Sequence, residues 1–218
     1  MAVAKTAVKK PATKATTGTG KAATKPAPAK TTAARKAPAR KAAPAAAPLP
    51  QVEPIDAATL LKADHRAVDA MFEAFDDARG KSEKSDLVAR ICTALKIHTM
   101  IEEEVFYPAL RGKIDDSIID EAYVEHDGAK VLVNDLSTGS PADAMYDAKV
   151  KVLAEEIRHH VKEEERWLTG MFAKARSAGV DMIDLGTKMA ARKAQLEADA
   201  AAAPLPVAKP TAVKLVTA

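Results

Sequence analysis

Four consecutive stretches of the chain, between Ile55 and Ala178, repeat apolar residues at steps of three and four with turn residues between them. That period places the apolar side chains on one face of a helix, and such a face must be buried against other helices. Stretches of about 20–30 residues joined by short turns predict an all-α fold built as an up-down-up-down four-helix bundle. A fifth, more weakly amphipathic helix is predicted from Asp181 to about Ala201.

Capping and stop residues set the expected limits of these helices. Asp56 is a suitable N-cap for the first helix, and Ser117 has capping-box spacing at the start of the third. Ser140 followed by Pro141 is typical of a helix start and predicts the beginning of the fourth. The five helices are expected over residues 56–78, 82–112, 117–139, 140–178 and 181–201. The second could begin at Ser82 or Ser85 and is expected to end between Pro108 and Gly112. The domain organisation expected from them is a basic tail over 1–54, the bundle over 55–178, the extra helix over 179–201 and a disordered tail over 202–218.

Composition supports this fold and excludes several classes. Eight aromatic residues and abundant Ala favour helices over an all-β fold. A single cysteine excludes a disulfide framework and a thiolate metal cluster. No apolar run approaches the ~18 residues of a membrane span, and three lysines among the first ten residues interrupt the apolar stretch that a secretory signal needs. We therefore expect no membrane partner and a cytoplasmic location.

Charge divides the chain into a basic tail and an acidic remainder. Residues 1–50 hold eleven Lys/Arg, seven prolines and no acidic residue, whereas residues 51–218 hold 22 Lys/Arg against 30 acidic residues. The tail has too few large apolar residues to offset the entropy of ordering, so it is expected to be disordered. Its composition resembles the Lys/Ala/Pro-rich tails of linker-histone-like proteins. It is expected to serve either as a solubilising spacer or as a segment that binds DNA or another polyanion without sequence preference, which would make the protein nucleoid-associated.

Each of the four bundle helices carries one histidine on its apolar face. These are His65, His98, His126 and His160. Two of them have a glutamate one turn later on the same face, Glu102 after His98 and Glu164 after His160. The fifth histidine, His159, points about 100° away from its neighbour.

The histidines also agree in height along the bundle. His65 and His98 lie 33 residues apart, and His126 and His160 lie 34 residues apart. Residues 98–104 also align with residues 160–166 at a constant offset of 62, as in an internal duplication. His65 and His98 are each 13 residues from their shared turn, or about 20 Å along antiparallel helices. His160 fits less well, so either the fourth helix overhangs or residues 141–147 belong partly to the connection. Two histidine-bearing hairpins are expected to converge on one pseudo-two-fold site.

This residue set points to metal binding. A His and a Glu four residues apart can bind one ion or adjacent ions, and unpaired glutamates inside a bundle are costly. Four imidazoles and two carboxylates are too few to saturate two octahedral ions, unless the carboxylates bridge and solvent fills the remaining positions. Solvent positions are where small ligands exchange.

The order His65, His98-x3-Glu102, His126, His160-x3-Glu164 resembles the hemerythrin-like (HHE cation-binding) domain over about residues 55–178. The resemblance implies a four-helix bundle with a non-haem di-iron centre, in which the two glutamates bridge the irons together with an oxygen or hydroxide. Manganese and zinc are not excluded by the donor types. It also implies a small diatomic or peroxide ligand and a role in handling O2, peroxide, nitric oxide or iron.

The chain departs from the oxygen-carrying members in two places. They have a second histidine one turn from the first on the third helix, where this chain has Ala122 and Lys130. Their final acid falls at the position of Glu165 rather than Glu164. The site is therefore expected to serve stress response or sensing, with peroxide consumption as one candidate activity, rather than oxygen transport. Tyr123 is either a residue that reaches the metal or a core tyrosine.

Three rival interpretations fit the sequence less well. A ferritin-type site needs Glu-x-x-His on two helices, and only Glu156-x-x-His159 fits. A zinc hydrolase keeps three ligands and one water on one metal, whereas this ligand set is two-fold. A nucleoid-associated protein would use the metal bundle mainly as a structural platform for the basic tail.

Overall fold

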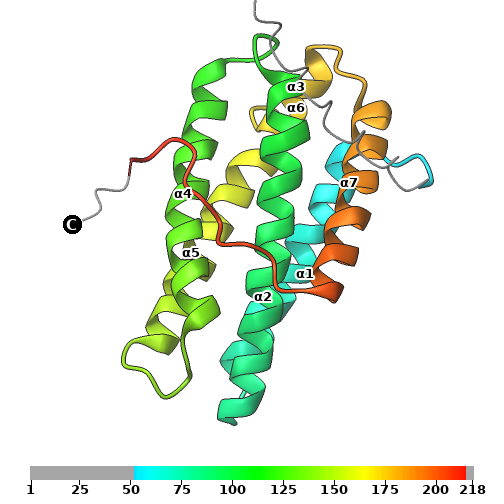
Figure 1. The fold of residues 1–218 in the computed structure, drawn as a ribbon. Coiled ribbons are helices and arrows are strands. Elements are labelled where there is room, and N and C mark those ends of the chain that lie inside the picture. The colour runs from blue at the N-terminus through cyan, green and yellow to red at the C-terminus, as the bar shows by residue number, and fades with distance from the viewer. Residues whose placement is uncertain (1–51, 215–218) are drawn as a thin grey trace, which may run out of the picture. The chain divides into compact units, whose positions relative to one another are not determined.

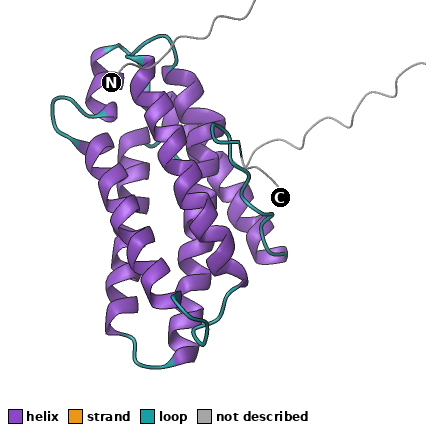
Figure 2. Cartoon of the chain, turned by 90° about the vertical axis from the view of Figure 1, so that its left-hand side faces the viewer, coloured by secondary structure: helices purple, strands orange, loops and turns teal. Residues whose placement is uncertain are grey.

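The computed structural model describes residues 52–214, all within the unit Ala46–Ala218, and they form a helical bundle (Figures 1 and 2). The expected tail over residues 1–50 lies outside the described residues. The helices are α1 (Ala57–Asp77), α2 (Lys81–Ile101), the π-helical turn η1 (Glu102–Phe106), α3 (Tyr107–Leu110), α4 (Asp116–Thr138), α5 (Tyr146–Glu165), α6 (Met171–Ser177) and α7 (Met182–Ala202). No described helix is long and apolar enough to cross a membrane.

Helices α1, α2, α4 and α5 form the four-helix bundle, in which α1 and α4 each contact both α2 and α5. Helix α7 lies outside this ring against α1 and α2 (Figure 1). Its approach to the start of α1 needs Gly186, because a Cβ there would collide with the Ile55 carbonyl oxygen. The predicted bundle with an additional C-terminal helix is confirmed.

Side-chain caps fix several helix ends as expected. Asp56 accepts a hydrogen bond from the Thr59 amide at 3.0 Å, and Asp181 accepts one from the Asp184 amide at 2.9 Å. Each bond satisfies an amide that the first helical turn leaves without a partner. The third bundle helix is capped by Asp115 rather than Ser117, whose amide donates to Asp115 at 3.0 Å.

The predicted fourth helix is wrong at both ends. Ser140 and Asp143 bond locally, with the Ser140 amide donating to the Asp143 carboxylate at 2.6 Å, and this turn delays the helix to Tyr146. Residues 141–145 therefore belong to the connection. The helix then ends at Glu165, and residues 166–170 form a turn before α6. Leu168 lies in this turn and is exposed, rather than buried on a continuing helix.

The C-terminal segment also differs from the prediction of a disordered tail. Residues 203–214 leave α7 and cross α2 and α4 (Figure 1). The Asn134 side chain on α4 holds this segment by donating to the Ala208 carbonyl at 2.7 Å and accepting from its amide at 2.9 Å. Sequence periodicity cannot detect such a segment, because its bonds come from residues more than 70 positions earlier.

Two apolar clusters fill the bundle, with a polar layer between them. One contains Leu61, Ile101 and Ala122, and the other contains Leu95 and Ala129. On α1, α2 and α4 the core histidine lies between a member of one cluster and a member of the other. Apolar packing on both sides thus positions the histidine layer.

Candidate metal centre

The four core histidines meet in this layer. All four are buried, and their Nε2 atoms point inward in two pairs. The Nε2 atoms of His65 and His98 are 3.2 Å apart, as are those of His126 and His160. The structure therefore brings together, from four helices, the histidines that the sequence singled out.

Glu102 and Glu164 lie between the two histidine pairs. Glu102 Oε2 is 3.1 Å from His98 Nε2 and 3.3 Å from His126 Nε2. Glu164 reaches His65 Nε2 at 3.4 Å and His160 Nε2 at 3.7 Å. Each glutamate thus contacts one histidine of each pair, as a bridging carboxylate would.

The donor atoms fall into two groups that share Glu102. One group is His65, His98, Glu102 and Glu164, and the other is Glu102, His126 and His160. Within each group the donor atoms lie within 4.8 Å of one another. Both Glu102 oxygens and Glu164 Oε2 are buried without a hydrogen-bond partner. Because orphaned buried carboxylates are costly, this donor set fits bound cations.

The outer nitrogen of each histidine faces a carboxylate. Nδ1 of His65 is 2.7 Å from Glu165, Nδ1 of His126 is 3.0 Å from Glu103, and Nδ1 of His160 is 2.8 Å from Glu125. His98 Nδ1 has a longer contact, 3.7 Å, with Asp64. Carboxylates in this position orient metal-binding histidines and raise their basicity. Glu165, an alternative metal ligand in the sequence, lies in this outer layer.

Tyr107, rather than Tyr123, reaches the cluster. The buried Tyr107 hydroxyl is 3.1 Å from His126 Nε2 and donates to Glu164 Oε1 at 3.4 Å. The Tyr123 hydroxyl instead donates to the Glu103 carbonyl at 3.4 Å. Sequence reasoning missed Tyr107 because it is five residues after Glu102, off the expected face of an α-helix. The π turn adds one residue to that helical turn and brings position i+5 round to the site.

Burial and close charges shift the pKa values of the cluster in different directions. Burial and the neighbouring His98 lower the pKa of His65 to about 4. Burial also acts to lower the pKa of His98, but the Glu102 carboxylate outweighs it and raises that pKa to about 10. Burial and repulsion from Glu102 raise the pKa of Glu164 to about 8. The metal-free cluster therefore holds protons where a metal ion would supply positive charge.

A buried ionic network supports the α4 side of the cluster. The ammonium group of Lys130 bonds with Glu103 at 2.7 Å and Asp127 at 3.0 Å. Asp127 also accepts hydrogen bonds from three consecutive amides of the C-terminal segment, those of residues 211–213, at 2.6–2.9 Å. Thr211 donates its hydroxyl to Glu103 at 2.9 Å. The network thus runs from the C-terminal segment through Glu103 to His126.

Little open space adjoins the histidines. A void of about 10 Å³ lies beside them, close to the minimum for one water molecule.

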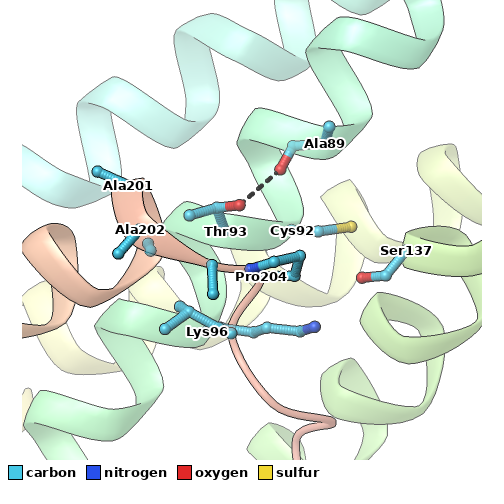
Figure 3. Close-up of a pocket in the computed structure, with 11 residues that line it drawn as sticks. Ala89, Cys92, Thr93, Lys96, Ser137, Ala201, Ala202 and Pro204 are labelled. Carbon is cyan, nitrogen blue, oxygen red and sulfur yellow. Dashed lines mark hydrogen bonds between the residues drawn. The ribbon is translucent and has the colours of Figure 1, made fainter.

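A larger cavity of about 430 Å³ lies elsewhere, where the end of α7 meets α2 and α4 (Figure 3). In that cavity Cys92 Sγ points toward the Ser137 hydroxyl, and none of the metal-site candidates lines it.

Comparison with known proteins agrees with this geometry. Residues 56–172, more than half of the chain, match the family described as Hemerythrin HHE cation binding domain, and the chain therefore belongs to that family. The crystal structure of a hemerythrin HHE cation binding domain-containing protein from Mycobacterium kansasii is similar, with a TM-score of 0.57 and 25% identity. That match covers 68% of this chain and 91% of the other.

A further relative is a Nostoc sp. protein named DNA nickase. It is 27% identical over 109 residues, which are 50% of this chain and 31% of that protein. The chain thus spans less than a third of the length of this relative.

Proposed function

We propose that the bundle holds two iron ions through His65, His98, Glu102, His126, His160 and Glu164 and reacts with a small oxidant such as peroxide, oxygen or nitric oxide. The observation that carries this proposal is the pair of buried donor groups sharing Glu102, with carboxylate oxygens that lack any other partner. The nitrogen and oxygen donors suit several first-row metals, and iron is preferred through the family resemblance. When bound, iron supplies redox chemistry and exchangeable positions for a small ligand.

The residues around the site define what the protein contributes. The outer carboxylates hold the imidazoles so that Nε2 faces inward. Burial and the charges of Glu102 and Glu164 raise the pKa of Tyr107, so its hydroxyl keeps its proton beside Glu164. The void beside the histidines is about 10 Å³, so the buried site suits small ligands better than organic substrates.

Two residues of α4 support reaction or sensing over oxygen transport. Ala122 is buried in an apolar cluster, and Lys130 uses its ammonium group in the network with Glu103 and Asp127. Neither supplies the additional imidazole of the oxygen carriers. We therefore expect a poor reversible carrier.

Spectroscopy of the iron-loaded protein tests this function. Addition of peroxide or nitric oxide should change the ultraviolet-visible spectrum, and repeated oxygenation should accumulate an oxidised form. Full oxygen release over many cycles, without that accumulation, would contradict the proposal. The same measurement on Tyr107→Phe shows whether the buried hydroxyl contributes to the reaction.

A second candidate function is non-specific DNA binding by residues 1–50. It is supported by their eleven cations and by the relative named DNA nickase. The rest of the chain is net acidic, so binding must come from the tail. If all eleven cations engaged duplex DNA, log K would fall against log salt with a slope near −10, and partial engagement predicts roughly −4 to −8. Equal DNA affinity with and without residues 1–50, or no binding by either protein at low salt, would leave the tail as a spacer.

A further inference from the structure

The one histidine outside the buried cluster, His159, has two carboxylates close to it on the bundle surface. His159 Nε2 is 3.6 Å from Glu125 Oε1 on α4 and 3.8 Å from Glu163 Oε1 one turn later on α5. The His159 side chain is 65% exposed, and the two glutamates are partly buried. Residues 159 and 163 thus repeat the His-x3-Glu spacing of the buried motif, shifted by one residue onto the outer face.

These three side chains have the donors and the spacing of a cation site. Their donor atoms lie within 4.8 Å of one another. Metal–ligand distances of about 2.0–2.2 Å require donor separations of up to about 4 Å, which ordinary rotation of exposed side chains can reach. Within residues 52–214, the one other cationic group near Glu163 is Arg166 at 3.8 Å, and such a solvent-accessible contact contributes little.

Glu125 connects this surface group to the buried cluster. Its Oε2 accepts a hydrogen bond from His160 Nδ1 at 2.8 Å, while its Oε1 faces His159. One carboxylate therefore contacts both the surface histidine and a candidate ligand of the buried centre. The two sites are separated by a single imidazole ring.

We propose that Glu125, His159 and Glu163 bind a divalent first-row transition-metal ion at the surface, and that this site loads the buried centre. One neutral imidazole and two carboxylates suit Fe²⁺, Zn²⁺ or Co²⁺ and give a net charge that attracts a cation. The site keeps open positions for water, so its ion exchanges readily. The loading role rests on the proposed di-iron function, whereas the surface site itself does not.

Metal counting on the full-length protein tests the surface site. Iron-loaded protein is dialysed against Zn²⁺, and iron and zinc are counted separately for the wild type, His159→Ala and Glu163→Gln. The wild type should bind one Zn²⁺ per chain beyond its iron, and both variants should bind it at least about tenfold more weakly. The control Glu73→Gln changes an exposed glutamate of α1, away from this group, and should behave as the wild type. Absence of the zinc in the wild type, or its retention in both variants, would overturn the proposal.

Loading kinetics test the second part separately. Metal-free wild type and His159→Ala are mixed with Fe²⁺, and bound iron is measured over time. The variant should load several-fold more slowly and reach the same final content of buried iron, counted after a chelator wash that removes iron from the surface. Equal rates would overturn the loading role. If the wild type binds no buried iron, the di-iron proposal fails. The surface site is still tested in that case, because zinc binding that depends on His159 does not require buried iron.

Discussion

The two histidine hairpins look alike in sequence but differ in their surroundings. After Glu102, the helix continues through a π turn that brings Tyr107 into the cluster, whereas after Glu164 the helix ends and the chain turns outward at Trp167. On the α4 side, Glu103 belongs to a buried network with Lys130. On the α1 side, Glu165 is partly exposed and lies 3.6 Å from Lys62. A repeated motif therefore fixes which donors converge but leaves their environments free to differ.

The two glutamates provide the largest expected contrast. Glu102 belongs to both donor groups, whereas Glu164 belongs to one. Glu102→Gln should weaken metal binding at both positions by more than about 100-fold, beyond the usual cost of losing an outer carboxylate. Glu164→Gln should have a smaller effect at the His126–His160 position, because Glu164 lies 3.7 Å from His160 Nε2 whereas Glu102 lies 3.3 Å from His126 Nε2. Metal equivalents per chain measure both effects, and equal losses in the two variants would mean that the hairpins are equivalent.

The buried network should dominate the stability of the α4 side. Asp127→Ala leaves the buried Lys130 with one fewer carboxylate and removes the acceptor for three amides, so the free energy of unfolding should fall by about 3–5 kcal/mol. Asp69→Ala removes an exposed pair with Arg158 and should cost only about 0.2–1 kcal/mol. Denaturant unfolding of the metal-free proteins compares them. Similar costs would contradict the predicted contribution of the Asp127 network to stability.

The protons held by the cluster predict that the stability of the metal-free protein falls with rising pH, whereas the affinity for metal rises. The folded-state pKa values of Glu164 (about 8) and His98 (about 10) lie above their ordinary values of 4.5 and 6.5. Their stabilising contribution is therefore complete below those ordinary values and is lost as pH rises through the folded-state values. Between pH 6.5 and 8 the melting temperature of the metal-free protein should fall. Metal affinity should rise over the same range, because both groups must lose a proton to bind metal.

The number of protons released on metal binding measures directly how many protons the metal-free cluster holds. Loading metal at pH 7 should release about one proton each from His98 and Glu164. His126 should add to this release, because burial lowers its pKa less than the neighbouring Glu102 and Glu103 carboxylates raise it. An indicator dye in weak buffer measures the release. His65 should add nothing, because its pKa of about 4 leaves it neutral at this pH. A release well below one proton would contradict the assigned protonation states.

The two tyrosines provide the smallest contrast. Tyr107→Phe removes the hydroxyl that donates to the buried Glu164, and should cost about 1–3 kcal/mol and shift the spectrum of the metal-loaded protein. Tyr123→Phe removes a 3.4 Å bond to the backbone of a partly buried residue and should cost about 1 kcal/mol or less, with no spectral change. A spectral change in Tyr123→Phe alone would reverse the assignment of the two side chains.

Local pattern was sufficient to predict the bundle and the histidine layer. Helical period placed the four histidines on buried faces, and the caps Asp56 and Asp181 marked real helix starts. These features depend on residues within one or two turns of each other. The same holds for the two His-x3-Glu pairs.

Features that depend on distant contacts could not be predicted in this way. The π turn at Glu102 changes the helical phase, so Tyr107 was overlooked and Tyr123 was considered instead. The early end of α5 and the placement of residues 203–214 depend on tertiary bonds, such as those from Asn134 and Asp127. Ser140 and Pro141 satisfied the rules for a helix start, but a competing local turn formed there.

The central claim is that the four histidines and two glutamates hold two metal ions. Iron and other metals should be counted per chain for the wild type, His98→Ala and His160→Ala, after a chelator wash that removes loosely bound ions. The wild type should retain two iron ions, and each variant should lose metal and melt at a lower temperature, because metal binding stabilises the folded state. Metal content that is unchanged in both variants would contradict the account.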